Sequence, residues 1–182
     1  MRLPDSPRLF FRELTIADFS DVAPLLLEDA VMQKFHPIVA EELVRRWLTR
    51  KLEQYHQYGH SHLHVSLKEN GEFVGIIGIT PETVEGIEYT GLGYLISPEH
   101  QRRGYAFEGA QACIDWAFRE LRPDTIIAEV DETNLPSRRL AEKLGMLCER
   151  TYLRFNGESE VPHLLYTLSS CNFCPKSGME SY

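Results

Sequence analysis

Apolar residues recur along the chain with the periods of buried strands and amphipathic helices. A short apolar run at Leu92–Ile96 is closed by Ser97-Pro98, which is typical of a buried strand. After a polar turn at 98–106, apolar residues follow at helical spacing: Ala110, Cys113, Ile114, Ala117, Phe118 and Leu121. The pattern therefore predicts a buried strand that leads through this turn into a helix packed on a sheet.

The other segments predict a mixed fold. We expect strands at Leu9–Leu14, His60–Leu67, Glu72–Ile79, Thr125–Val130, Glu149–Phe155 and His163–Leu168. We expect helices from the cap at Thr15–Asp18 to about Glu28, at Glu41–Tyr58 and at Asn134–Leu144. Asn-Gly pairs at 70–71 and 156–157 indicate hairpins. The order β-α-α-β-β-β-α-β-α-β-β predicts an α/β (α+β) fold, with a mostly antiparallel sheet and one parallel pair around the central helix.

The turn before the central helix has the composition of an anion site. The first turn of a helix carries backbone N–H groups without partners and the positive end of the helix dipole. Gly104 and Ala106 leave the backbone open to an approaching anion, and Arg102 and Arg103 add positive charge. This turn suits a pyrophosphate, although a plain connecting loop with two solvated arginines would look the same.

The complete run around this turn resembles a known family. Residues 91–110, G-L-G-Y-L-I-S-P-E-H-Q-R-R-G-Y-A-F-E-G-A, resemble the acetyl-CoA-binding motif of the GNAT acetyltransferases. The flanking G-Y-x-x-x-P-E and G-Y-A-x-E are similar to the branch of the Rim-type ribosomal-protein alpha-N-acetyltransferases, where Ala commonly stands at the position of Ala106. The segment from Val130, V-D-E-T-N-L-P-S-R-R-L-A-E-K-L-G-M, also resembles that branch, and the likeness extends from Arg8 to Leu168.

The resemblance implies a GNAT-like sheet with a splayed parallel strand pair, flanking helices and acetyl-CoA as co-substrate. It implies direct attack of an amine on the thioester in a ternary complex. The cofactor-binding residues that it implies are Tyr94, Leu95 and Ile96 for the pantetheine arm, Arg102, Arg103, Gly104, Tyr105, Ala106 and Phe107 for the pyrophosphate, and Asn134 on the other strand. Ser137 matches the serine that protonates the departing thiolate in the Rim-type enzymes.

The general base is less well defined in the sequence. Enzymes of the family use a glutamate, and this chain offers Glu88, Glu158 and Glu160 near the expected acceptor side. We favour Glu160, although each of the three also fits a solvated carboxylate. Glu108 belongs to the G-Y-A-x-E motif and complements the dipole at the start of the central helix.

The fraction of an amine that is neutral at pH 7 favours one class of acceptor. An α-amino group with a pKa of about 7.8 is roughly 14% neutral at pH 7, whereas a lysine at about 10.4 is only about 0.04% neutral. A site without an evident strong base therefore fits an α-amine, such as the N-terminus of a ribosomal protein. A small amine or amino acid remains an alternative acceptor, and a CoA-binding module without turnover is an alternative function.

Composition limits the remaining classes of function. The chain has 182 residues, of which 43% are hydrophobic, so we expect one domain at 1–168 and a loose tail at 169–182. A net charge of −8 argues against nucleic-acid binding. We expect no membrane span or signal peptide, and hence a cytoplasmic protein, either a monomer or a homodimer.

Two groups of residues raise the question of a metal. His60, His62 and His64 alternate along one predicted strand, so they share a face, and Cys171 and Cys174 form a C-x-x-C pair. Three histidines without an added carboxylate or cysteine are more typical of half-exposed strand residues. One C-x-x-C pair supplies only half of a tetrahedral zinc site. We expect no bound metal.

Overall fold

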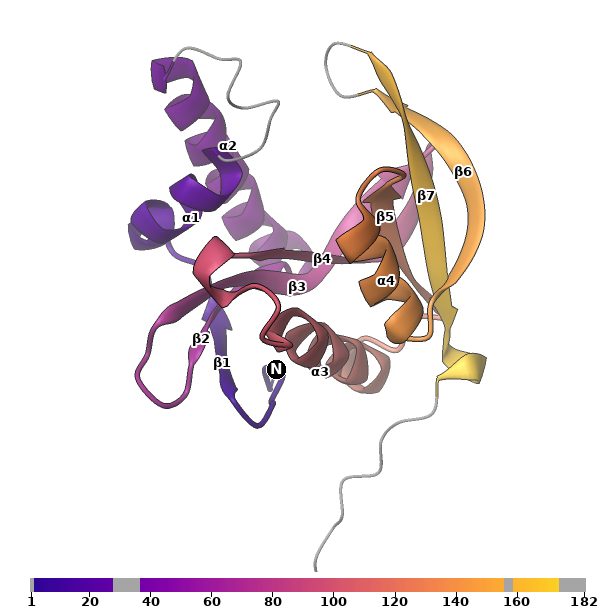
Figure 1. The fold of residues 1–182 in the computed structure, drawn as a ribbon, viewed down its shortest axis with the longest axis horizontal. Coiled ribbons are helices and arrows are strands. Elements are labelled where there is room, and N and C mark those ends of the chain that lie inside the picture. Colours follow the sequence, from indigo (N-terminus) through magenta and orange to yellow (C-terminus); the bar gives the residue numbers. More distant parts are fainter. Residues whose placement is uncertain (1, 28–36, 156–158, 174–182) are drawn as a thin grey trace, which may run out of the picture.

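The computed structural model describes residues 2–27, 37–155 and 159–173, which form a seven-stranded sheet with helices on both faces (Figure 1). The strands are β1 (Leu9–Glu13), β2 (His62–Leu67), β3 (Phe73–Val84), β4 (Ile87–Ile96), β5 (Thr125–Asp131), β6 (Leu147–Phe155) and β7 (Glu160–Ser169). The helices are α1 (Phe19–Leu27), α2 (Pro37–Tyr58), α3 (Tyr105–Glu120) and α4 (Leu135–Lys143). The predicted order of strands and helices is confirmed.

The strand order across the sheet is β1-β2-β3-β4-β5-β7-β6. Of the strand pairs that the structure describes, β4 and β5 are parallel and all others are antiparallel. The connection between β4 and β5 runs through α3, as a parallel crossover requires. The predicted mostly antiparallel sheet with one parallel pair is therefore correct.

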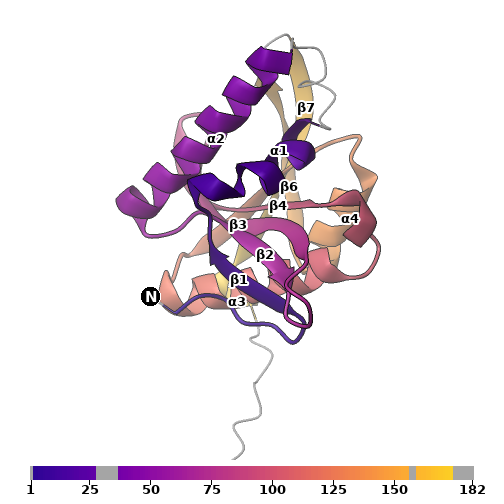
Figure 2. The same cartoon turned by 90° about the vertical axis from the view of Figure 1, so that its left-hand side faces the viewer.

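Alternation along the strands sorts side chains to the two faces of the sheet. The larger apolar core lies between the sheet and α3 and includes Ile77, Ile114 and Ile126. A smaller core joins Leu48 of α2 to Ile76 of β3 on the opposite face. Figure 2 shows α1 and α2 on one side of the sheet and α3 on the other.

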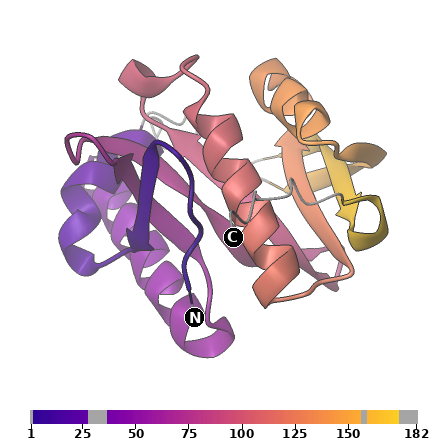
Figure 3. The same ribbon diagram turned by 90° about the horizontal axis from the view of Figure 1, so that it is seen from below.

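The helix α3 crosses the centre of the sheet. Seen from below, it has β1 and the N-terminal segment on one flank and α4 on the other (Figure 3). Its N-cap is Gly104, and Gly109 faces the sheet where a side chain would overlap Ile77. This close approach holds the first turn of α3 beside the end of β4.

The hairpin of β3 and β4 is longer than predicted. We expected these strands to span Glu72–Ile79 and Leu92–Ile96, but they extend to Val84 and begin at Ile87. Glu85 and Gly86 form the turn, with φ of 50° and 82°. The added part carries polar residues because it extends beyond the larger core, so no continuous apolar run marks it.

The described C-terminal residues are packed beyond position 168. β7 ends at Ser169, a short 3-10 turn follows at 170–172, and the ring of Phe173 lies 4.6 Å from that of Phe118. The loose tail that we expected from 169 therefore does not include residues 169–173, and 174–182 lie outside the described residues. Across the described part of the chain, none of the helices has the length and apolar character needed to cross a membrane.

Candidate active site

A gap between β4 and β5 forms the centre of the candidate site. Thr90 pairs with Ile126 and Gly91 with Ile127, and no described residue pairs the two strands beyond that point. A pocket of about 260 Å³ occupies the gap. Its lining consists of His62, Leu92, Gly93, Tyr94, Leu95, Ala128, Glu129, Val130, Asp131, Asn134 and Ser137. The predicted splayed parallel pair is confirmed, and four of the predicted site residues line the opening.

The open edge of β4 suits an extended ligand. Past Gly91, β4 pairs with β3 on one side only, so backbone groups on the other side lack a strand partner among the described residues. Such an edge can bind an extended amide-bearing chain as an added strand. Tyr94 and Leu95 line the pocket, and Ile96 follows them at the end of β4. This geometry fits the pantetheine arm that the resemblance implies.

The turn before α3 leaves room for an anion. Arg102 and Gly104 have φ of 58° and 85°, in the left-handed region that glycine adopts without strain. The nearest atom that a side-chain carbon added at Gly104 would meet is Nη2 of Arg8, at 3.5 Å. The helix begins at Tyr105, so its first-turn N–H groups and dipole are directed at this turn. These residues therefore fit the pyrophosphate of acetyl-CoA.

Arg8 is a cation at this turn that the sequence reasoning missed. Its Nε donates to Oε2 of Glu108 at 2.6 Å, and its Nη1 donates to the carbonyl oxygen of Arg103 at 3.3 Å. Its guanidinium carbon also lies 4.5 Å from the centre of the Tyr105 ring. Arg8 lies far from the motif in the sequence, and no local pattern signals the contact.

Glu108 does more than complement the helix dipole. Burial acts to raise its pKa, but hydrogen bonds from the backbone and side chain of Arg8 and from Ser6 hold the pKa below its ordinary value. The carboxylate is therefore ionised at neutral pH and fixes Arg8 against the turn. The place of Glu108 in the motif thus has a structural reason in this chain.

Asn134 and Ser137 stand at the start of α4 on the far side of the pocket. Oδ1 of Asn134 accepts a hydrogen bond from the backbone N–H of Ser137 at 3.1 Å, which makes Asn134 the N-cap. The Tyr94 hydroxyl donates to the carbonyl oxygen of Ser137 at 3.3 Å. Burial raises the pKa of Tyr94, so its phenol stays protonated at neutral pH. Ser137 lines the pocket, and the Tyr94 hydroxyl lies beside it.

Two further side chains line the pocket from the α2 face of the sheet. His62 lies over Gly93, where an added side-chain carbon would overlap its Nε2. Glu129 of β5 accepts a hydrogen bond from the Tyr152 hydroxyl and lies 3.6 Å from Nη1 of Arg154. Neither residue was among our predicted site residues. Their place depends on pairing between distant strands, which local sequence does not reveal.

The three predicted bases lie elsewhere or outside the described residues. Glu160 is exposed at the start of β7, opposite Phe155, and is not part of the pocket lining. Glu88 lines a different pocket of about 490 Å³ between α2 and the long hairpin of β3 and β4. Glu158 lies outside the described residues. The structure therefore does not bring Glu160 or Glu88 together with Ser137.

The alternating histidines do not converge. His62 and His64 are buried rather than half-exposed, so that expectation was wrong. His60 binds the carbonyl oxygen of Ile79 through Nδ1, and His62 packs on Trp47 with ring centres 5.6 Å apart. His64 instead pairs with Asp21 of α1 at 3.2 Å. Each ring thus has separate surroundings. The C-x-x-C pair remains undescribed, because Cys174 lies outside the described residues.

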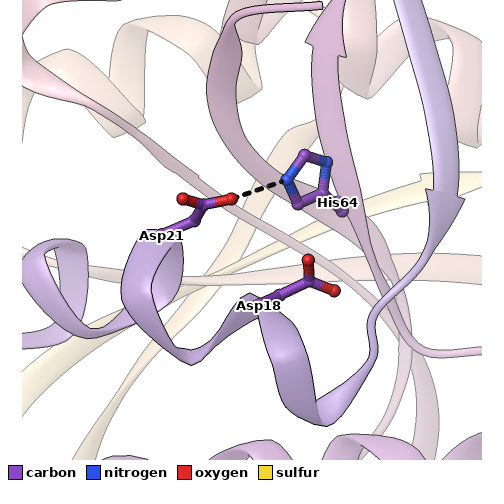
Figure 4. A group of neighbouring side chains, drawn as sticks. All are labelled: Asp18, Asp21 and His64. Atoms are coloured by element: carbon purple, nitrogen blue, oxygen red, sulfur yellow. Dashed lines mark hydrogen bonds and ion pairs between the residues drawn. The ribbon is translucent and has the colours of Figure 1, made fainter.

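His64 belongs to a compact polar group with Asp18 and Asp21 (Figure 4). One ligand atom from each lies within 4.8 Å of the others. Both oxygens of Asp18 already accept hydrogen bonds from Arg12, at 2.6 and 2.8 Å, and the backbone N–H of Thr15 adds a third. A protein cation thus already balances the charge of Asp18, and the arrangement gives no support to a metal centre here.

Comparison with known proteins decides the family. Residues 8–147 match the acetyltransferase (GNAT) domain family. This chain belongs to the GNAT acetyltransferases. It is 31% identical over 150 residues to the uncharacterized protein YkkB of Bacillus subtilis (strain 168), an alignment that covers 82% of this chain and 87% of YkkB. The GNAT fold explains why the open edge of β4 and the turn before α3 occur together.

Solved structures agree with this assignment. An acetyltransferase from Agrobacterium tumefaciens str. C58 is 28% identical, with a TM-score of 0.74 over 92% of this chain and 94% of the other. The ribosomal-protein-S5-alanine acetyltransferase of Vibrio fischeri is 17% identical, with a TM-score of 0.71 over 94% of this chain and 98% of the other. The second likeness concerns the fold alone. The protein is thus an acetyltransferase of the GNAT type, and the family uses acetyl-CoA as co-substrate.

Proposed function

We propose that this GNAT enzyme transfers acetyl directly from acetyl-CoA to the α-amino group of a protein or peptide. The observation that carries the proposal is the pocket between β4 and β5, which joins an open strand edge to the Ser137 hydroxyl. Both reactants can meet there, and the resemblance to the GNAT family implies that the amine attacks the thioester directly. Holding two reactants in one geometry is itself a large part of catalysis.

The residues around the pocket supply distinct functions. The backbone of Tyr94, Leu95 and Ile96 would bind the pantetheine arm, and Asn134 would hold it from α4. The turn at 102–107 would bind the pyrophosphate, assisted by Arg8. The Ser137 hydroxyl would give its proton to the departing sulfur, which is a willing acceptor when the two are held in contact.

Three features support an α-amine as the acceptor. A neutral amine is needed for attack, and an α-amine supplies it at pH 7 far more often than a lysine does. The motifs at 91–110 and from Val130 resemble the Rim-type branch. A Vibrio fischeri enzyme named for acetylation of a ribosomal protein has the same fold. We therefore place a protein N-terminus, such as that of a ribosomal protein, ahead of small amines.

Release of CoA from acetyl-CoA tests the proposal directly. Peptides with a free N-terminus and blocked lysines should be acetylated faster than the same peptides with a blocked N-terminus and one free lysine. Mass spectrometry of the products would locate the acetyl group. Release with small amines or amino acids but with no peptide would replace the protein acceptor by a small one. Binding of acetyl-CoA without release across the whole panel would indicate a module that binds CoA without turnover.

A further inference from the structure

The pocket between β4 and β5 contains three groups that could take a proton from the acceptor: His62, Glu129 and Asp131. Glu129 is held by the Tyr152 hydroxyl and by Arg154. Asp131 accepts from the backbone N–H and the hydroxyl of Thr133 at 2.7 and 2.6 Å, and hydrogen bonds from Thr133 lower its pKa. Both carboxylates are therefore already engaged by other groups of the protein in the structure.

His62 differs from these two carboxylates. Nδ1 of His62 is buried without a hydrogen-bond partner, and so is Nδ1 of His64. The two rings differ at Nε2, which pairs with Asp21 in His64 and has no partner among the described residues in His62. An imidazole in this state is uncommon in a protein interior, because an unsatisfied buried polar atom destabilises the fold. Nε2 of His62 lies over Gly93, which lines the pocket, so an acceptor amine or a water can complete its hydrogen bonding there.

The neighbouring strands are adapted to the position of this ring. His62 pairs with Gly78 of β3, which pairs with Gly93 of β4, so two glycines lie in one row beside the histidine. Their missing side chains let the ring lie over β4 at the point where β4 and β5 separate. Trp47 packs on the ring, and the Tyr55 hydroxyl donates to the His62 carbonyl oxygen. The ring is thereby held with Nε2 over Gly93.

The surroundings keep His62 neutral. Burial, followed by the charges of Lys51 and Arg50 on α2, holds its pKa well below 6.5. The other titratable groups around it are Tyr55 of α2, on its carbonyl oxygen, and Tyr94, Glu129 and Asp131, which line the same pocket. At pH 7 the ring therefore has one nitrogen free to accept a proton.

We propose that His62 is the general base of the reaction, an inference that rests on the proposed acetyl transfer. The acceptor nitrogen forms a bond to the thioester carbonyl carbon, and the carbon–sulfur bond breaks. Nε2 of His62 takes the proton that the nitrogen loses, directly or through one water, and Ser137 gives a proton to the sulfur. His62 then returns its proton to solvent while Ser137 regains one, so the overall reaction moves one proton from nitrogen to sulfur.

The position of the base relative to the acid supports this assignment. His62 reaches the pocket from the α2 face, whereas Ser137 reaches it from α4 on the α3 face. A nitrogen nucleophile and a sulfur leaving group are on different sides of the reacting carbon, so base and acid are needed on different sides of the pocket. His62 and Ser137 are placed in this way.

Chemical rescue of a His62→Ala variant tests the assignment. We expect kcat/KM for the amine to fall on the order of 100-fold, the lower part of the usual general-base contribution, while acetyl-CoA binding is unchanged. Added imidazole should restore turnover, and more basic imidazoles should restore it better. If the His62 ring only fills space, the turnover of the variant should not depend on the basicity of the added imidazole. Absence of rescue in a variant that still binds acetyl-CoA would overturn the assignment.

Two more variants test whether His62 acts as a base or only fills space. His62→Gln keeps similar volume and a hydrogen-bond acceptor but cannot take the proton, so it should be as slow as His62→Ala. A folded His62→Gln protein with wild-type turnover would contradict the role. His64→Ala is the matched control, because His64 is also buried on the same face of β2 but pairs with Asp21. Imidazole should not change its turnover. If the wild-type enzyme acetylates no amine, the proposed function fails instead.

Discussion

At the scale of single residues, Ser137 can be separated from its structural surroundings. The N-cap bond of α4 uses the backbone N–H of Ser137, so Ser137→Ala keeps that bond and the start of the helix. We expect kcat to fall on the order of 100-fold, because a hydroxyl is a weak general acid, while affinity for acetyl-CoA and thermal stability hold. Steady-state kinetics with calorimetric binding of acetyl-CoA would measure both.

Arg139→Ala provides the control for this change. Arg139 lies on the same helix and is not part of the pocket lining, so its removal should leave kcat unchanged. If Ser137→Ala has wild-type kcat, the proton comes from another group. The Tyr94 hydroxyl beside Ser137 would then be the next candidate, and Tyr94→Phe would test it.

The residues that sequence could and could not locate differ in a physical way. Tyr94, Gly104, Asn134 and Ser137 lie in continuous segments whose local pattern predicts the element of each residue, and whose resemblance to the GNAT family implies a role for each. The place of His62 depends instead on the pairing of three strands, because Gly78 and Gly93 make its space. A sequence pattern places His62 on a face but does not show its depth or its neighbours.

At the scale of elements, substitutions at the turn into α3 can distinguish the effect of backbone strain from the loss of acetyl-CoA binding. Gly104→Glu would place a carboxylate where the pyrophosphate is expected and should abolish acetyl-CoA binding. Because φ at Gly104 is 85°, any side chain also adds strain of about 1 kcal/mol. Gly145→Glu is the control, since φ there is 83°, no atom lies within 4 Å of an added side-chain carbon, and the residue follows α4.

Both glutamate variants should lose similar stability in denaturant titrations. Only Gly104→Glu should lose binding, measured by calorimetry with acetyl-CoA. Unchanged affinity in Gly104→Glu would remove the pyrophosphate from this turn. Equal loss of affinity in both variants would mean that strain in the fold, rather than the carboxylate, weakens binding.

Element boundaries were predictable where apolar periodicity and turn residues agreed. The strand Leu92–Ile96 and helix α3 were found because apolar runs and Gly104 mark them, whereas the far half of the β3–β4 hairpin was missed. That half has Glu82, Thr83 and Glu88 on strands that leave the larger core, so burial no longer imposes alternation. Apolar periodicity in a sequence indicates which residues are buried. It does not predict a strand that is held mainly by backbone hydrogen bonds to its neighbour.

At the scale of the whole molecule, a buried lysine beside the candidate site does not favour stability. Lys51 of α2 is only 2% exposed, and the structure gives it no ion pair within 4.0 Å among the described residues. Its Nζ lies 5.4 Å from the centre of the Trp47 ring, which also packs on His62. A buried lysine and a buried histidine that both contact Trp47 oppose folding, and the charge of Lys51 acts on His62 by lowering its pKa.

The pH dependence of stability tests this interpretation of Lys51. Burial lowers its pKa from 10.5 to about 8, with Glu82 opposing the shift. Between these two values the unfolded chain binds more protons than the folded one, so the free energy of unfolding rises as pH rises from 8 to 10.5. At pH 7 the shift destabilises the folded state by up to about 3 kcal/mol. Lys51→Met should therefore unfold at higher denaturant concentration at pH 7.

The comparison of the two proteins from pH 7 to 10 is the decisive measurement. Lys51 titrates in this range only in the wild-type protein, so the difference in unfolding free energy should shrink as pH rises. A constant difference would mean that Lys51 is not strained in its charged form. Because Lys51 also lowers the pKa of His62, the stabilised Lys51→Met enzyme should have a more basic imidazole and an acetylation rate that responds to pH at a higher value than in wild type. The single change at Lys51 would then alter both the free energy of unfolding and the pH at which activity falls on the acidic side.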